Sequence, residues 1–258
     1  MNRQQEVTID TFDLRGRRAL ITGASSGLGT HFAKTLAAAG AEVLLAARRL
    51  DRLHDLEAEI VANGGTVRSA SLDVTDAASV AALVRGHPDI DIVVNNAGVV
   101  REARVYDIEE ADWDAVIDTN QAGVFRVAQA YAKMMRQRGS GGSIINIASI
   151  LGLLQGAGVL PYAVSKAAVV QMTKVMALEL ARDGIRVNAI APGYIETELN
   201  EAFWETEPGK AMIRRIPQRR LGELRDLDGP LLLLASPASA YMTGSVISVD
   251  GGHLVSGL

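Results

Sequence analysis

Residues 18–29 have the sequence R-A-L-I-T-G-A-S-S-G-L-G, and this stretch decides the fold that the sequence predicts. The apolar run 19–21 is typical of a short buried strand. Three glycines follow it, at Gly23, Gly27 and Gly29, with the spacing G-x-x-x-G-x-G. Glycine allows the backbone of such a turn to approach a ligand closely, because no Cβ stands in the way.

A helix is predicted directly after the turn, from Leu28 to Ala39. The start of a helix carries unpaired N–H groups and the positive end of the helix dipole, so it can bind a pyrophosphate. For the glycines alone, a tight turn that binds nothing is the alternative. We expect this turn to bind a dinucleotide through Gly23, Ser25, Ser26, Gly27, Leu28 and Gly29.

Composition bounds the class of protein. The chain has 258 residues, of which 48% are hydrophobic and 22% charged, so it fits one soluble α/β domain. A net charge of −4 without a basic block argues against nucleic acid as a partner. There is no cysteine and none of the four histidines is spaced as a metal pair, so we expect no metal. Without a signal peptide or an apolar run of membrane-spanning length, we expect a cytoplasmic protein with no membrane partner.

Short apolar segments alternate with helical patterns along the chain. Residues 1–13 form a polar N-terminal leader, and 14–258 are expected to form a single dinucleotide-binding catalytic domain. Alternation of this kind predicts a doubly wound Rossmann fold, with about seven parallel strands and helices on both faces. The strands are expected near 19–22, 42–46, 66–71, 90–94, 143–148, 185–191 and 246–249. Helices are expected near 28–39, 50–62, 76–85 (behind a cap at Thr75), 108–138 (broken near 120–123), 160–182 and 224–235, whereas 194–217 looks irregular.

Tyr162 and Lys166 are four residues apart at the start of the predicted helix 160–182, so they lie on one helix face. An ordinary tyrosine has a pKa of about 10, and a nearby ammonium favours the phenolate, so we expect Lys166 to lower the pKa of Tyr162. Ser149, at the end of the fifth strand, could hydrogen-bond a substrate oxygen beside that phenol. An exposed helix face is the alternative for Tyr162 and Lys166 alone, but the serine thirteen residues upstream makes the pattern specific.

At these positions the sequence resembles the short-chain dehydrogenase/reductase family over nearly its whole length. The motifs that carry the resemblance are T-G-A-S-S-G-L-G (22–29), D-V (73–74), N-N-A-G (95–98), Asn120, Ser149, Y-A-V-S-K (162–166) and P-G-Y-I-E-T (192–197). The resemblance implies a nicotinamide-dependent enzyme that moves a hydride between the cofactor and a carbonyl or alcohol carbon. It implies that Tyr162 is the general acid/base, Ser149 orients the reacting oxygen, Lys166 holds the nicotinamide ribose and Asn120 keeps a water.

Other residues are expected to bind the cofactor. Asp73 is placed to accept the adenine amino group, although a helix-capping or turn aspartate is an equal alternative. The resemblance implies that Ile195, through its backbone, and Thr197, through its hydroxyl, clamp the carboxamide. Small residues let the backbone pass close under the adenosine half, although an Asn-rich turn is the plainer interpretation of 95–98. The remaining expected contacts are Val74, Asn96, Ala97, Gly98, Pro192 and Gly193.

The end of the second strand decides the choice of cofactor. An NAD-preferring enzyme usually has Asp or Glu there, whereas this chain has Ala47 followed by Arg48 and Arg49. An arginine fork is suited to a 2′-phosphate, so we expect NADP(H) to be preferred, with NAD(H) possible. Arg48 is the favoured contact, with help from Ser25, and solvated charges ahead of a helix are the alternative.

The resemblance implies a substrate lid at residues 194–217, and a surface helix with a stripe of core residues is the alternative. Its apolar members are Leu199, Phe203, Trp204, Met212 and Ile213. With the apolar segment 152–159 as the opposite wall, an apolar ketone or secondary alcohol is favoured. Residues 215–222 also resemble 3-oxoacyl-thioester reductases, without selecting a substrate. An NAD-dependent dehydrogenase of a hydroxy acid, sugar or steroid is the alternative, and a non-catalytic dinucleotide-binding regulator a third. The helices 112–138 and 160–182 carry more apolar surface than one face of a monomer needs, and the resemblance implies that they form the interface of a homotetramer. The C-terminal 249–258 is expected to dock on a neighbouring subunit or near a substrate pocket.

Overall fold

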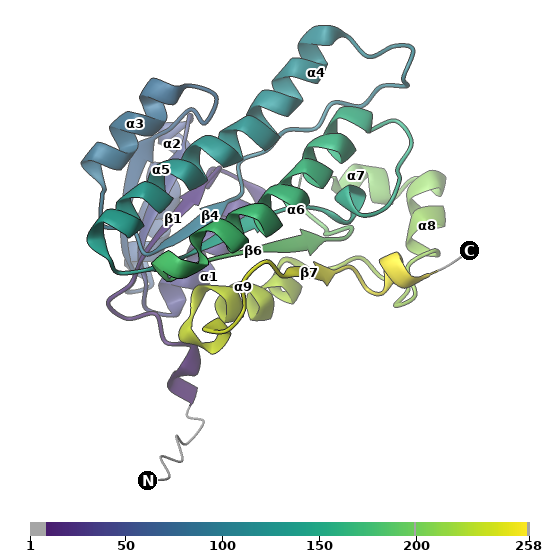
Figure 1. Ribbon diagram of the computed structural model, residues 1–258. Coiled ribbons are helices and arrows are strands. Elements are labelled where there is room, and N and C mark those ends of the chain that lie inside the picture. Colours follow the sequence, from purple (N-terminus) through teal and green to yellow (C-terminus); the bar gives the residue numbers. More distant parts are fainter. Residues whose placement is uncertain (1–8, 199, 257–258) are drawn as a thin grey trace.

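Seven parallel strands form one sheet in the computed structural model, which describes residues 9–198 and 200–256 (Figure 1). The strand order is β3-β2-β1-β4-β5-β6-β7. This confirms the predicted doubly wound α/β fold. The strands are β1 (Arg18–Thr22), β2 (Glu42–Ala47), β3 (Thr66–Ser71), β4 (Ile92–Asn95), β5 (Gly142–Ile147), β6 (Ile185–Pro192) and β7 (Val246–Val249).

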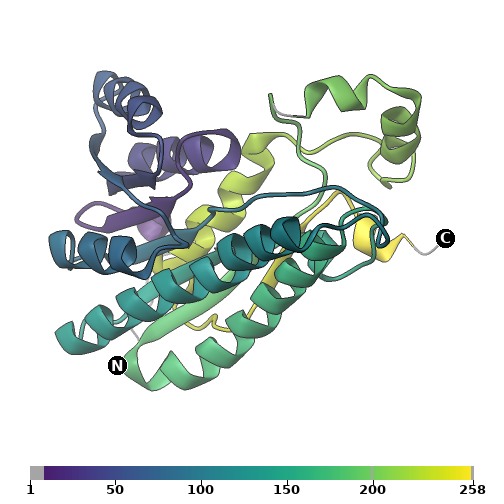
Figure 2. The same cartoon turned by 90° about the horizontal axis from the view of Figure 1, so that it is seen from above.

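Helices cover both faces of the sheet, as Figures 1 and 2 show. Ala19 and Ile21 of β1 pack toward α1, α2 and α9, whereas Leu20 packs toward α3, α5 and α6. Both faces are therefore apolar, as expected of a buried parallel sheet. The helices are α1 (Gly27–Ala38), α2 (Leu50–Ala62), α3 (Ala77–Gly86), α4 (Glu110–Ile117), α5 (Gly123–Arg138), α6 (Leu160–Leu180), α7 (Glu201–Trp204), α8 (Glu207–Ile213) and α9 (Asp228–Ala235).

The direction of winding reverses at β1, which lies between β2 and β4. In open parallel sheets a ligand binds beyond the carboxyl ends of the strands at such a switch point. Thr22 of β1 is in register with Ala46 of β2, and Ile21 with Val94 of β4. The turn after β1 and the loops after β2 and β4 therefore leave the sheet side by side.

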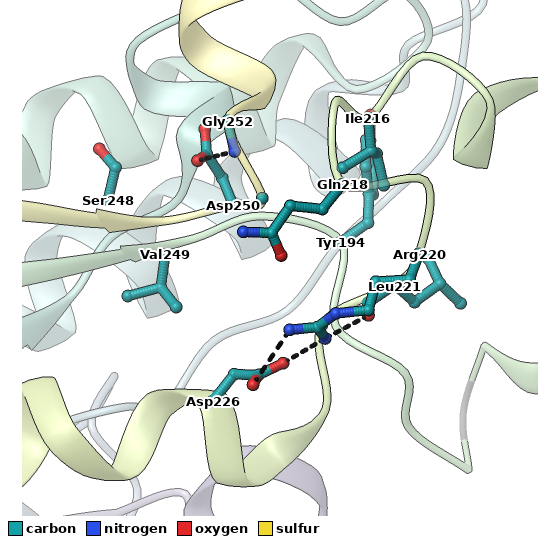
Figure 3. A pocket seen from close by; sticks show the side chains of 12 residues that line it. Tyr194, Ile216, Gln218, Arg220, Leu221, Asp226, Ser248, Val249, Asp250 and Gly252 are labelled. Carbon is teal, nitrogen blue, oxygen red and sulfur yellow. Dashed lines mark hydrogen bonds and ion pairs between the residues drawn. The ribbon is translucent and has the colours of Figure 1, made fainter.

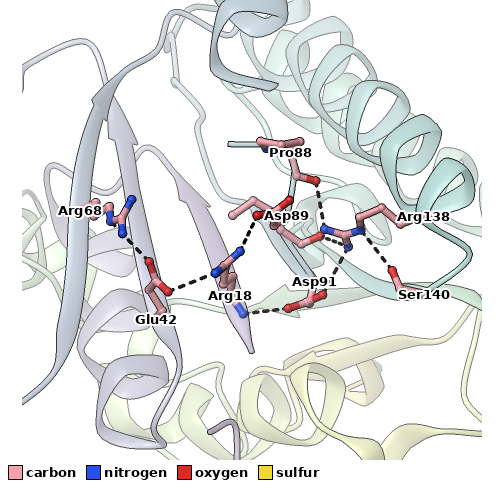
Figure 4. A network of polar contacts seen from close by, with 9 residues as sticks. Arg18, Glu42, Arg68, Pro88, Asp89, Asp91, Arg138 and Ser140 are labelled. Atoms are coloured by element: carbon pink, nitrogen blue, oxygen red, sulfur yellow. Dashed lines mark hydrogen bonds and ion pairs between the residues drawn. The ribbon is translucent and has the colours of Figure 1, made fainter. Parts of the chain in front are cut away.

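The opposite end of the sheet is held by charged side chains (Figure 4). Arg18 Nη1 lies 2.6 Å from Asp89, and Arg18 Nε lies 3.2 Å from Glu42. Arg138 on α5 donates to Asp91 at 3.3 Å. The two ion pairs of Arg18 are partly exposed, and exposed pairs each contribute only about 0–1 kcal/mol to stability.

Two local predictions were wrong. The cap of α3 is Asp76, whose carboxylate accepts a hydrogen bond from the Ala78 N–H at 2.8 Å, and Thr75 instead donates to Asp73. The stretch 194–217 is not irregular throughout, because it contains α7 and α8. Helices of four and seven residues are too short to show a periodic pattern in the sequence.

Some predictions concern residues outside the described ranges. The leader residues 1–8 and Leu199 of the expected lid are outside them, and Ile9–Phe12 of the leader form a short 3-10 helix. Within the described ranges, no helix is long and apolar enough to cross a membrane.

Candidate active site

The glycine turn after β1 is closely packed against the loop after β4. Gly23 (φ 68°) and Gly27 (φ 54°) are in the left-handed region, which favours glycine. A Cβ at Gly23 would lie 2.8 Å from the Ala97 Cα, and one at Gly29 would collide with the Gly23 carbonyl oxygen. The glycines therefore let the turn pack directly against the loop after β4 and the start of α1, and the binding of a dinucleotide there stays a prediction.

Thr22 and Asn96 hold the two loops together. The Thr22 hydroxyl accepts hydrogen bonds from the Asn96 N–H at 3.0 Å and the Ala97 N–H at 3.1 Å. The Asn96 amide donates to the carbonyls of Thr22 (3.0 Å) and Gly23 (3.2 Å). Asn96 thus shapes the turn with its side chain, and the role of Thr22, at the last position of the strand, was missed from the sequence.

Two serines and an arginine lie over the start of α1. Ser26 precedes the helix, yet its hydroxyl caps no N–H among the described residues. Arg49 Nη2 lies 3.0 Å from the Ser25 hydroxyl and 3.5 Å from that of Ser26. Arg48 is exposed and lies close enough to Asp73 to affect its carboxylate. The structure therefore brings Arg49 to the turn, rather than the Arg48 that the sequence favoured.

Asp73 and Val74 follow β3. Asp73 Oδ1 accepts from the Thr75 hydroxyl at 2.7 Å and from the Thr75 N–H at 2.9 Å. These hydrogen bonds, with a smaller contribution from Arg48, keep the pKa of the Asp73 carboxyl below its usual range. Val74 is buried. Asp73 thus has the turn role that was one alternative, and its contact with adenine stays a prediction.

Ser149 and Tyr162 meet at the carboxyl end of β5. Ser149 lies two residues beyond the strand, and its hydroxyl accepts a hydrogen bond from the Leu151 N–H at 3.1 Å. Tyr162 is in the first turn of α6, and it lies close enough to Ser149 for the serine hydroxyl to favour the phenolate in part. The strand and the helix therefore bring together the two hydroxyls that the sequence separates by thirteen residues.

The electrostatics of Tyr162 differ from the prediction. Burial raises its pKa, and the nearby Ser149 hydroxyl lowers it only in part. Lys166 Nζ lies 5.6 Å from the centre of the Tyr162 ring and donates to the Ile147 carbonyl at 2.7 Å. The Lys166 ammonium thus points to the Ile147 carbonyl of β5. Burial lowers the pKa of Lys166 to about 8. The predicted lowering of the Tyr162 pKa was therefore wrong for these residues.

Asn120 joins three elements of the site. It lies in the π-helical turn 118–122 between α4 and α5, where the sequence predicted a break. Its amide accepts from the Val99 N–H at 2.8 Å and donates to the Val99 carbonyl at 2.9 Å and to Ser165 at 3.1 Å. Ser165, which was missed from the sequence, donates to the Tyr162 carbonyl at 2.7 Å. A Cβ at Gly98 would lie 3.3 Å from Asn120 Oδ1, so Gly98 belongs to the same cluster.

The segment after β6 turns sharply at Pro192 and Gly193. A Cβ at Gly193 would lie 2.7 Å from the Asp250 Cα, which explains the glycine. Asn200 then fixes the next residues, because its amide donates to the Ile195 carbonyl at 2.8 Å and accepts from the Thr197 N–H at 2.9 Å. The predicted carboxamide clamp is thus held in one conformation.

A cavity of about 360 Å³ lies beside this segment (Figure 3). Its lining includes Tyr194, Gln218, Val249 and Gly252, and an ion pair in which Arg220 lies 2.6 Å from Asp226. The predicted catalytic residues do not line it. We find no cluster of three potential metal ligands within residues 9–198 and 200–256.

Known proteins share this fold and sequence. A family model described as enoyl-(acyl carrier protein) reductase matches residues 23–253. A gluconate 5-dehydrogenase from Gluconobacter oxydans is 41% identical over 252 residues, which are 96% of this chain and 98% of that protein. A 3-oxoacyl-[acyl-carrier-protein] reductase from Thermotoga maritima is also 41% identical, over 94% of this chain and 99% of that protein. The solved structure of a gluconate 5-dehydrogenase from Burkholderia cenocepacia, in complex with NADP and tartrate, has a TM-score of 0.92 and 40% identity, over 96% of this chain and 99% of that chain.

These relatives show that the chain is a nicotinamide-dependent oxidoreductase acting on CH–OH groups. The family model and the relatives together show that it belongs to the short-chain dehydrogenase/reductase family.

Proposed function

We propose that the protein interconverts a ketone and a secondary alcohol with NADP(H), in one catalytic domain formed by residues 14–258. The observation that carries this proposal is the proximity of Ser149 and Tyr162 beside the buried Lys166, whose Nζ lies 5.6 Å from the centre of the Tyr162 ring. Because burial raises its pKa, Tyr162 keeps its proton at neutral pH and can donate it to a carbonyl oxygen.

Each residue of the site then has a defined task. Ser149 donates a hydrogen bond that orients the reacting oxygen, and Tyr162 transfers the proton to or from that oxygen. Lys166 places a positive charge next to the tyrosine ring and holds the nicotinamide ribose. Asn120 fixes the loop after β4 to the helix that carries Tyr162, and we assign it the water of the proton relay. The bound nicotinamide supplies or accepts the hydride.

The residues around the glycine turn fit the cofactor, because a Cβ at Gly27 would meet no atom within 4 Å, so the start of α1 borders open space that a cofactor can enter. The pyrophosphate would lie at the start of α1, against the N–H groups of residues 26–29. Ser25 with Arg48 and Arg49 would bind the 2′-phosphate, since an arginine pairs well with a phosphate. Two solved relatives with bound NADP support this choice.

For the substrate, the apolar walls 152–159 and 203–213 favour a substrate with an apolar surface next to the reacting carbon. A hydroxy acid is the second candidate, because several similar proteins are named for gluconate or a gluconate derivative. The names of the 3-oxoacyl-[acyl-carrier-protein] reductases support the first candidate.

We also propose a homotetramer that assembles through α5 and α6. The outer face of α6 exposes Val164, Val175 and Leu178, and α5 exposes Phe125. These apolar side chains follow helical spacing along α6, so they form a continuous stripe that a second copy can cover. Location in the cytoplasm stays a prediction from the sequence.

A Tyr162→Phe variant tests the proposed chemistry. Removing the hydroxyl should lower kcat by about 100-fold or more, because a positioned acid/base contributes about 10²–10⁴. NADPH affinity, followed by cofactor fluorescence, should stay within about twofold, since the ring is kept. Unchanged activity would refute the mechanism, and tighter binding of NADH than NADPH would refute the choice of cofactor.

A further inference from the structure

Three aromatic side chains from separate segments meet beyond the carboxyl ends of β6 and β7. Tyr194 follows the turn at Gly193, Trp204 ends α7 of the lid, and His253 lies in the C-terminal 3-10 helix 253–255. The Tyr194 ring centre is 5.5 Å from that of Trp204 and 5.4 Å from that of His253. The Tyr194 ring thus packs against both the lid and the C-terminal segment.

Two nitrogen atoms of this cluster are buried without a partner. Trp204 Nε1 and His253 Nδ1 make no hydrogen bond within the described residues, and the Trp204 side chain is more than nine-tenths buried. Buried indole N–H groups usually have a hydrogen-bond partner, and an unpaired one is costly. Buried polar atoms without a partner are few in native proteins. Two of them on rings that both contact Tyr194 indicate that a group from outside the chain forms hydrogen bonds with them.

The surroundings indicate the chemistry of that group. Tyr194 and Gly252 line the cavity of Figure 3, so open space reaches the edge of the cluster. Burial raises the pKa of the Tyr194 hydroxyl, and Arg215 lies close enough for its positive charge to oppose that rise. Arg215 makes no ion pair with the described part of the chain, so its charge is available for a negatively charged oxygen.

We propose that Tyr194, Trp204 and His253 form a subsite for the polar, non-reacting end of the substrate, which carries a hydroxyl or carboxylate oxygen. The indole N–H donates to that oxygen, and the imidazole exchanges a hydrogen bond with a neighbouring hydroxyl. This subsite rests on the proposed function and narrows its substrate to a hydroxy acid or a similarly polar alcohol. The apolar walls then contact only the part of the substrate near the reacting carbon.

Tryptophan fluorescence can test the subsite, because the chain has two tryptophans and only Trp204 lies in the cluster. A Trp113→Phe variant keeps Trp204 as the only indole. This protein is saturated with NADPH and titrated with D-gluconate, which cannot react in that complex because both partners are reduced. We expect a saturable change in Trp204 emission with gluconate and none with 2-hexanol, an apolar secondary alcohol.

A second variant separates recognition from packing. His253→Phe keeps a ring against Tyr194 and removes the ring nitrogens. It should raise the gluconate concentration at half-saturation by about 2- to 10-fold, the usual size of one lost hydrogen bond between neutral groups. In turnover, KM for gluconate should rise while kcat and the KM for 2-hexanol change by less than about twofold.

The outcomes are distinguishable. If NADPH binds but gluconate leaves the emission unchanged, the subsite is wrong while the proposed function stands. If His253→Phe affects gluconate and 2-hexanol alike, the cluster only supports the lid and the subsite is also wrong. If neither NADPH nor NADH binds the protein, the proposed function fails first, and the subsite fails with it.

Discussion

Lys166 carries a charge that the fold buries at a cost, so replacing it should stabilise the protein while inactivating it. The residue is 4% exposed, and burial lowers its pKa from the ordinary 10.5 to about 8. At about 1.4 kcal/mol per pKa unit, the buried charge costs about 3 kcal/mol of folding free energy at pH 7. Lys166→Met removes the charge and keeps a long, unbranched side chain.

The expected gain is smaller than that cost. Lys166 donates to the Ile147 carbonyl at 2.7 Å, and a buried carbonyl that loses its donor costs about 1–3 kcal/mol. Lys166→Met should therefore raise the free energy of unfolding by about 0–2 kcal/mol at pH 7. Its kcat/KM should fall by about 100-fold or more, because the charge beside Tyr162 is lost.

The pH dependence is the sharper test of the buried charge. Below pH 8 both the folded and the unfolded protein hold the proton of Lys166, so the cost is fully present. Between pH 8 and 10.5 the unfolded state binds more protons than the folded state, and the stability of the wild type rises with pH.

The test is urea unfolding of the wild type and of Lys166→Met at one protein concentration. Between pH 7 and pH 10, the free energy of unfolding of the wild type should rise by about 2 kcal/mol more than that of the variant. Other titrating groups are shared by the two proteins and cancel in the difference. A difference that stays constant over this range would refute the reasoning, since it would mean that the ammonium is not desolvated in the folded state.

Three further changes test the fold and the cofactor site. Tyr131→Phe removes a buried hydroxyl that has no partner within the described residues, so urea unfolding should show no loss and up to about 1 kcal/mol of gain; a clear loss would reveal a partner. Gly29→Ala places a Cβ against backbone atoms and should lower the free energy of unfolding by about 1–3 kcal/mol. The Cβ of Gly27→Ala meets open space, so this variant should lose only about 1 kcal/mol, which is the strain of alanine in a left-handed conformation. Equal losses would contradict the packing of the turn. Arg49→Ala should weaken NADPH binding about 10-fold or more and NADH binding less than about threefold, with Arg48→Ala as the matched comparison; the reverse order of the two variants would restore the assignment made from the sequence.

The sequence was sufficient for features that depend on local chemistry. Apolar runs such as 90–94 predicted the strands, in this case β4 (Ile92–Asn95). The fixed spacing of Tyr162 and Lys166 placed both residues on one helix face. The glycine turn was predictable because its conformation admits few other residues. The alternation of strands and helices predicted the parallel sheet, whereas the place of the switch point at β1 came from the structure.

Features that depend on tertiary burial were not predictable. The pattern Tyr-x-x-x-Lys does not show that the lysine ammonium contacts the carbonyl of Ile147, nineteen residues away on β5. Likewise, two adjacent arginines look equivalent in a sequence, and only the structure shows that Arg49 contacts Ser25. The cluster of Tyr194, Trp204 and His253 joins three segments that no local pattern connects.

Burial also links the stability of this site to its chemistry. The environment that makes the charge of Lys166 costly is the one that keeps Tyr162 protonated, because desolvation disfavours the charged form of both groups. A protonated tyrosine beside Ser149 is ready to donate to a carbonyl oxygen, which is the step that reduction requires. The residues alone therefore favour the reduction of a ketone, and oxidation of an alcohol first needs the pKa of Tyr162 to fall. A pH profile of kcat should accordingly show oxidation rising toward alkaline pH, in the range where reduction declines.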